Sequence, residues 1–141
     1  MQELVKKHAE KIRFGIVGVA NTSLDFIVLF VLVGLGVDKI IANYFSTSVA
    51  FIFSFFVNKS FAFKSKGGNV KRQFALFFIV TIIGLWVIQP LIIAGITALL
   101  ANSGLAAGII LFIAKIIATI ASLIWNYLFY SRLVFKKLED N

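Results

Sequence analysis

Residues 74–100, FALFFIVTIIGLWVIQPLIIAGITALL, form an apolar run of 27 residues without a charged side chain. About 20 consecutive apolar residues match the hydrocarbon thickness of a bilayer, so this run predicts a transmembrane helix. Three further apolar runs are Phe14–Leu35, Ile40–Val57 and Leu105–Phe129. All four favour helices, since lipid requires internally satisfied backbone groups and the alternation of barrel strands is absent. The sequence therefore predicts an all-α integral membrane protein with four transmembrane helices.

The composition excludes a soluble enzyme. The 141 residues are 60% hydrophobic and 14% charged, with a mean hydropathy of +0.99, whereas soluble domains are about 45–50% apolar and about 25% charged. So short a chain has too little interior to bury this many apolar side chains. The absence of cysteine excludes thiolate catalysis, and one histidine with six acidic residues offers no metal cluster. Phosphate-loop, zinc-protease and Ser-His-Asp patterns are also absent, so we expect no catalytic residues, metal or other cofactor.

Basic residues predict the orientation in the membrane. They gather in an N-terminal segment (1–13), a connector (58–73) and a tail (130–141): Lys6, Lys7, Lys11 and Arg13; Lys59, Lys64, Lys66, Lys71 and Arg72; Arg132, Lys136 and Lys137. The two other connectors hold only Lys39, which Asp38 offsets. The positive-inside rule therefore places both termini and the connector 58–73 in the cytoplasm, with segment 1–13 as a short interfacial helix. The net charge of +8 fits this topology and anionic lipid headgroups better than nucleic acid.

A shift of 72 residues lays the second apolar run on the fourth, with Ala42 on Ala114 and Thr47 on Thr119. Polar and small residues then recur with steps of 4, 3, 4 and 4: Asn43, Thr47, Ala50, Ser54 and Asn58; Lys115, Thr119, Ser122, Asn126 and Tyr130. Such steps keep each set on one helical face. We predict two hairpin repeats of parallel orientation, related by an axis along the membrane normal. The alternative is that small and hydroxyl residues line helix contacts in any membrane bundle.

Two charged residues fall near the predicted midplane. At 1.5 Å per residue, Asp25 lies roughly 17 Å along its helix from Phe14, and Lys115 lies roughly 21 Å from Phe129. An isolated charge there costs several kcal/mol, so we expect Asp25 and Lys115 to pair. The pair either contacts substrate or couples protons, or it is a structural ion pair, which is a poor stabiliser by itself.

Other polar residues allow two interpretations each. Asn21, one turn before Asp25 on the same face, suits sugar hydroxyls or an interhelical hydrogen bond. Lys59 and Arg132, at the ends of the second and fourth runs, are positive-inside anchors or a cationic grip on a lipid phosphate. Gln89-Pro90 predicts a kink with a freed carbonyl, which is more typical of packing than of a binding site.

Three motifs in order carry a resemblance to a known family. They are RFGIVGVANT (13–22) followed by Asp25, NKSFAF (58–63), and Asn126-Tyr127 with Arg132 and Phe135. With these motifs the chain resembles, over essentially its whole length, the GtrA-like family of small four-helix membrane proteins. It departs from the family pattern at Ser54, where the family often has Asn, and at Phe61, where Trp is common.

The resemblance implies translocation (flipping) of a polyprenyl-phosphate-linked sugar across the cytoplasmic membrane, for cell-surface polysaccharide glycosylation. The implied partners are that lipid, membrane lipids and a membrane glycosyltransferase, and a homodimer is expected because four helices enclose little space. The expected substrate-binding residues are Asn21, Asp25, Asn58, Lys59, Lys115, Thr119, Ser122, Asn126 and Arg132. One alternative is a non-transporting membrane scaffold that recruits or anchors a glycosyltransferase. Another is a proton-coupled exporter of soluble cations, against which the positive charge of Lys115 counts.

The predicted topology can be tested by cysteine labelling, because the natural chain has no cysteine. Cysteine introduced at Lys39 or Ser103 is expected to react with an impermeant thiol reagent added outside intact cells, whereas cysteine at Gly67 is not. Labelling at Gly67 alone would contradict the topology.

Overall fold

The computed structural model describes residues 1–136, apart from the side chains at positions 39 and 40. Its elements are α1 (Gln2–Gly34), α2 (Lys39–Val57), η1 (Asn58–Ala62), α3 (Val70–Ile83), η2 (Gly84–Ile88), α4 (Gln89–Leu100), α5 (Ala107–Phe129) and η3 (Tyr130–Val134), where η marks one π-helical turn. The part of the predicted tail from Lys137 onward lies outside the described residues.

Four continuous helical segments are long and apolar enough to cross a membrane: Gln2–Gly34, Ile41–Ala62, Val70–Leu100 and Ala107–Val134. Residues 1–136 contain no strand. The predicted all-α architecture with four transmembrane helices is therefore confirmed. The cytoplasmic location of the termini remains a prediction.

The helix ends differ from the predicted span ends. The segment 1–13 is the start of α1 and continues into the first span without a break, while its interfacial position remains a prediction. The second and fourth spans each continue by one π-helical turn, in which the N–H of Phe63 donates to the carbonyl of Asn58 at 2.9 Å and that of Phe135 to the carbonyl of Tyr130 at 2.8 Å. The connector therefore has helical structure at its start.

Local signals explain where the chain turns. Gly36 and Gly104 adopt φ angles of 92° and 80°, which place them in the left-handed region that glycine enters without steric cost. Gly36 lies in the connection between α1 and α2, and Gly104 lies in the connection between α4 and α5. At the start of α3 the side chain of Asn69 accepts a hydrogen bond from the backbone N–H of Arg72 at 3.3 Å, as an N-cap residue does.

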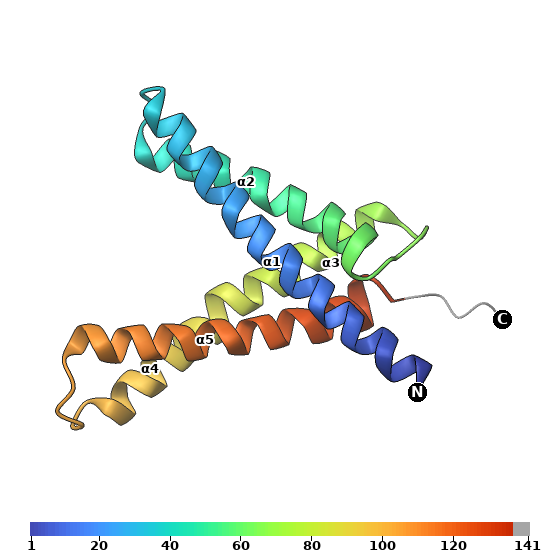
Figure 1. The fold of residues 1–141 in the computed structure, drawn as a ribbon. Helices are drawn as coiled ribbons and strands as arrows, with labels where there is room; N and C mark the ends of the chain where they lie inside the picture. The colour runs from blue at the N-terminus through green and yellow to red at the C-terminus, as the bar shows by residue number, and fades with distance from the viewer. Residues whose placement is uncertain (137–141) are drawn as a thin grey trace. The chain divides into compact units, whose positions relative to one another are not determined.

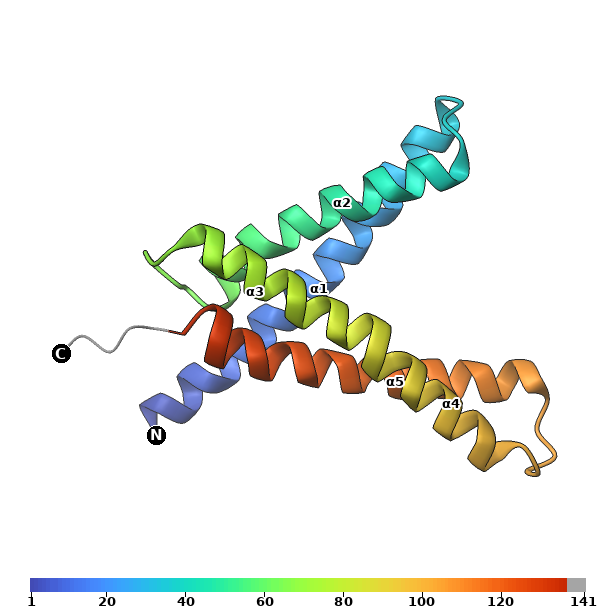
Figure 2. The same ribbon diagram turned by 180° about the vertical axis from the view of Figure 1, so that it is seen from behind.

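The chain forms two compact units, Met1–Gly68 and a second that begins at Asn69. In the first unit α1 packs along α2, and in the second unit α4 packs along α5 (Figures 1 and 2). Each unit is thus a helical hairpin with its own interior.

The first unit is closed at one end by a contact between α1 and η1. The Nε of Arg13 donates to the carbonyl of Ala62 at 3.1 Å, and the rings of Phe14 and Phe63 lie 6.0 Å apart. Val17 on α1 is buried, as are small residues of α2, among them Ala42 and Ser46. Small side chains let the two backbones approach closely.

The second unit is closed by an aromatic cluster. Phe77 of α3 stacks on Tyr130 of η3 at a centroid distance of 4.5 Å, and Phe135 lies beside both rings. The hydroxyl groups of Tyr130 and Thr81 share a short hydrogen bond. These contacts fix the second half of α3 against η3, the turn that follows α5.

Burial in the second and fourth spans recurs at the interval of 72 residues. The buried pairs are Ala42 and Ala114, Ser46 and Ala118, Ala50 and Ser122, Asn58 and Tyr130, Ala62 and Val134, and Phe63 and Phe135. The turns η1 and η3 stand at the same interval. The two spans therefore have matching local structure, while the duplication and the parallel orientation of the hairpins remain predictions.

Gly84 marks a close approach of η2 to α5. A Cβ at this position would lie 3.0 Å from Oδ1 of Asn126 and 3.4 Å from Cδ1 of Trp125. The indole N–H of Trp125 also donates to the carbonyl of Val80 at 3.0 Å, so the contact is held on both sides. A larger residue at 84 must separate the two helices or displace Asn126.

Gly84→Leu is expected to lower the free energy of unfolding by about 1–3 kcal/mol, the usual cost of overpacking. Denaturant unfolding in detergent micelles would measure the change. Gly95→Leu is the matched control in the same span, because a Cβ there meets nothing within 4 Å. Equal stability of the two variants would contradict the close contact.

Candidate functional site

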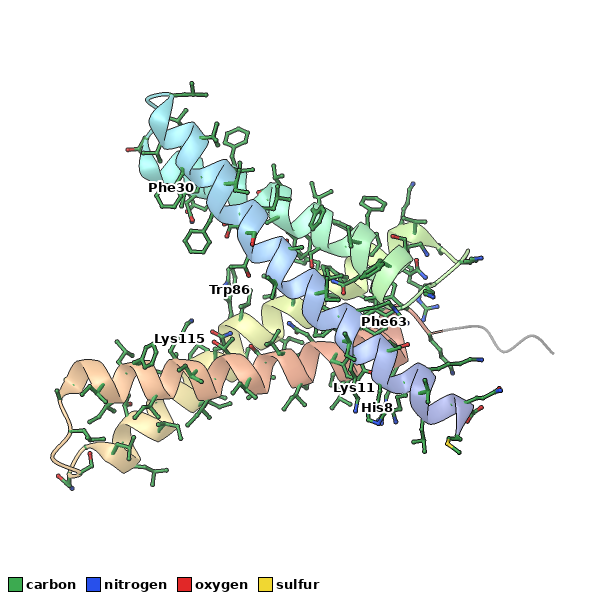
Figure 3. All side chains as sticks on the ribbon, in the orientation of Figure 1. His8, Lys11, Phe30, Phe63, Trp86 and Lys115 are labelled. Carbon is green, nitrogen blue, oxygen red and sulfur yellow. The ribbon has the colours of Figure 1, made fainter. Side chains whose placement is uncertain are left out.

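A hydrogen-bonded chain of polar side chains crosses the interior of the second unit. The ammonium of Lys115 on α5 donates to Oε1 of Gln89 at 2.9 Å; Lys115 is labelled in Figure 3. The amide Nε2 of Gln89 donates to Oγ of Ser122 at 2.8 Å, and the Ser122 hydroxyl donates to the carbonyl of Thr119 at 3.0 Å. Gln89 and Ser122 are 6% and 3% exposed. This chain of contacts links Lys115, the one charged residue of α5, to the neighbouring helix α4.

The π-helical turn η2 places Gln89 in this chain. Pro90 has no N–H, and in a regular helix its ring would meet the carbonyl of Trp86. The helix widens by one residue instead, and the N–H of Gln89 donates to the carbonyl of Gly84. The irregularity thus lies where Gln89-Pro90 predicts one, but Gln89 is the centre of a polar network.

The predicted substrate-binding residues do not include Gln89, although the structure places it at the centre of this network. The available signal was a lone amide inside a run of 27 residues without charge, directly before the only proline of the chain. That signal cannot show which face of the helix the amide occupies, because a π turn rotates the residues after it.

Two other predicted residues of α5 lie beside the network. Thr119 donates its hydroxyl to the carbonyl of Lys115 at 2.7 Å, a bond within its own helix. Asn126 lies one turn beyond Ser122, and its Oδ1 is buried without a hydrogen-bond partner. The structure therefore brings Lys115, Thr119, Ser122 and Asn126 onto one side of the second hairpin with Gln89.

In the first unit, two predicted polar residues, Asn21 and Asp25, lie on α1. They are one turn apart, and Oδ1 of each is buried without a hydrogen-bond partner. A buried polar atom in this condition costs about 1–3 kcal/mol. Both oxygens are thus positioned to accept a hydrogen bond. The pairing of Asp25 with Lys115 concerns residues of different units and remains a prediction.

Three predicted residues lie near the ends of the second and fourth spans. Asn58 is buried and donates its amide to the carbonyl and hydroxyl of Ser54 at 2.8 and 3.1 Å, while its Oδ1 has no partner. The ammonium of Lys59 donates to the carbonyl of Gly67 at 2.9 Å, which folds the connector back on η1. Arg132 is exposed. At the interval of 72 residues Arg132 corresponds to Ser60, not to Lys59.

Residues 1–136 contain no group of three or more His, Asp or Glu side chains that could hold a metal. Four membrane-spanning helices, with polar side chains buried within each unit, define a multi-pass membrane protein. The family model described as GtrA/DPMS, transmembrane domain, matches residues 13–135. The chain belongs to this family, as its three motifs predict. A search of curated proteins finds no match.

The Asp25–Lys115 pair can be tested by a double-mutant cycle. If Asp25 and Lys115 pair, Asp25→Asn and Lys115→Met each destabilise the protein, since loss of one partner of a buried pair costs about 3–5 kcal/mol. Thermal unfolding and activity are measured together. A structural pair recovers both in the double mutant, whereas a functional pair recovers stability alone.

Asn43→Leu is the control, because Asn43 occupies the Lys115 position at the interval of 72 residues and is exposed. This variant is expected to be milder than Lys115→Met. Fully stable and active single variants would show that Asp25 and Lys115 are neither paired nor required.

Proposed function

We propose that this protein translocates a polyprenyl-phosphate-linked sugar across the cytoplasmic membrane, for glycosylation of cell-surface polysaccharide. Membership of the GtrA/DPMS transmembrane domain family supports this proposal. The observation that carries it is a set of buried acceptor oxygens within the helices that have no donor: Oδ1 of Asn21, Asp25, Asn58 and Asn126. Sugar hydroxyls both donate and accept hydrogen bonds, so a sugar headgroup supplies the missing donors.

The physical difficulty of this transport is to move a phosphate and a sugar across about 30 Å of hydrocarbon while the lipid tail stays in the bilayer. Asn21 and Asp25 accept hydrogen bonds from sugar hydroxyls along α1. Ser122 and Asn126 offer the same chemistry along α5. Lys115 adds a positive charge for the phosphate. These roles involve binding and release only, so no covalent step and no cofactor is needed.

Entry of the headgroup is assigned to the cytoplasmic face. Arg132 is exposed at η3, and a guanidinium suits bidentate contact with phosphate. The ammonium of Lys59 donates to the carbonyl of Gly67 and so holds the connector in place. In this position the ammonium can contact a phosphate only at the surface of the connector. Because one chain encloses little space, the transporting unit is a homodimer of parallel chains that works with a membrane glycosyltransferase.

One observation favours a second function, a scaffold that recruits or anchors a glycosyltransferase. The connector has defined structure: besides the Lys59 contact, the N–H of Ser65 donates to the carbonyl of Lys59 at 2.7 Å, and Ser65 is buried. An ordered loop outside the membrane presents a constant surface to a partner. In this function the connector is essential and the polar residues of the spans are not.

Reconstitution separates the two functions. Proteoliposomes with the protein are expected to move a labelled polyprenyl-phosphate-linked sugar faster than protein-free liposomes, and Asn126→Leu is expected to slow this movement about tenfold, since a lost hydrogen bond to a charged or polar ligand is worth roughly 1.5 kcal/mol. Thr97→Val is the control, because the Thr97 hydroxyl donates only within α4 to the carbonyls of Ile93 and Ala94. Absence of movement by the natural protein would favour the scaffold.

A further inference from the structure

Lys115 is the one charged residue between Gln73 and Arg132 in the sequence. Its ammonium has three N–H donors, and the one contact described for it is with Oε1 of Gln89. The side chain is exposed on the surface of the second unit. The ammonium is therefore held at one side and accessible at the other.

Its partner is a neutral amide, which leaves the positive charge uncompensated within the hairpin. Inside a membrane such a charge is unfavourable unless an anion accompanies it. A carboxylate at position 89 would form an ion pair and remove that demand. Gln89 instead orients the ammonium and keeps its charge available to an external anion.

Gln89 is itself fixed at its other end. Its Nε2 donates to Ser122, whose hydroxyl donates to the carbonyl of Thr119. If the amide of Gln89 were turned over, its NH₂ group would face the Lys115 ammonium, and two hydrogen-bond donors would face each other. The direction of the amide is thus set by its two neighbours, and the turn η2 with Pro90 keeps it buried while Trp86 and Leu91 are exposed.

We propose that Gln89 is a positioning residue for a phosphate-binding site at Lys115, and that the ligand is the phosphate of a polyprenyl lipid. The assignment of this lipid, as opposed to another phosphate, rests on the proposed function. The site needs only the second unit, and its chemistry disfavours soluble cations as cargo, because the charge of Lys115 is positive.

The test is Gln89→Glu in the full-length protein. The change replaces one amide by a carboxylate at the same place, so the Lys115 ammonium gains an internal ion pair. In nanodiscs of phosphatidylcholine, affinity for undecaprenyl monophosphate is expected to fall about ten- to hundredfold, the range for one charge-assisted contact. The thermal midpoint is expected to stay equal or rise, which a purely structural role of Gln89 does not predict.

Gln73→Glu is the matched control. Gln73 is another buried glutamine of the same unit, and 16 residues separate it from Gln89, roughly 24 Å along a helix. Affinity equal to that of the natural protein is expected for this variant. An equal loss in both variants, or unchanged affinity in Gln89→Glu, would overturn the proposal.

A third variant, Gln89→Leu, keeps the charge of Lys115 but removes the oxygen that accepts its hydrogen bond. Weaker binding of undecaprenyl monophosphate and a lower thermal midpoint are expected. If Gln89→Leu binds as tightly as the natural protein, Gln89 does not position the ammonium and the proposal fails. This arm does not depend on how a carboxylate behaves at position 89.

Two comparisons identify the source of the phosphate and separate this proposal from the proposed function. Phosphatidylglycerol and inorganic phosphate are expected to compete weakly, and equal competition by either would reject the polyprenyl ligand. Translocation is measured separately in proteoliposomes. Tight, Gln89-dependent binding without translocation supports the site and refutes the transport function, whereas translocation without such binding refutes the site.

Discussion

Within hydrocarbon no water is present to satisfy a polar group, and this constraint shapes every part of the structure. Backbone groups are satisfied within each segment, which is why the spans are helices. Where proline removes a donor at position 90, the ladder shifts to the next carbonyl within η2. Where a side chain carries a charge, as at Lys115, another helix supplies an acceptor. Among residues 1–136, the buried side-chain atoms left without a partner are Oδ1 of Asn21, Asp25, Asn58 and Asn126.

The π-helical turns η1, η2 and η3 share one physical effect. Each inserts a residue into the helical ladder and so turns the following residues onto a new face. After η2 this rotation brings Gln89 toward α5, and at the ends of η1 and η3 it buries Phe63 and Phe135. The shift costs some helical hydrogen-bond geometry and gives a side-chain arrangement that a regular helix with the same sequence lacks.

Much of the fold follows from run length and residue type. The four spans can be predicted because a chain this short cannot bury four runs of about 20 apolar residues in a soluble core. The positions of polar residues on one face of α5 follow from spacing alone. The contact of Lys115 with Gln89 does not follow from spacing, because the direction of the Gln89 side chain depends on the rotation that η2 introduces. The contact of Lys59 with Gly67 cannot be predicted from the sequence either. The course of a connector depends on backbone angles such as the φ of 78° at Gly67.

The closure of each hairpin within its own unit has a consequence for biosynthesis. The contact of Arg13 with Ala62 and that of Phe14 with Phe63 use only residues that precede Gly68. During translation both partners of each of these contacts are therefore present before α3 has left the ribosome. The second hairpin is likewise completed by its own residues, such as Phe77 and Tyr130. Insertion can thus proceed as two successive hairpin steps, each ending in a packed pair of helices.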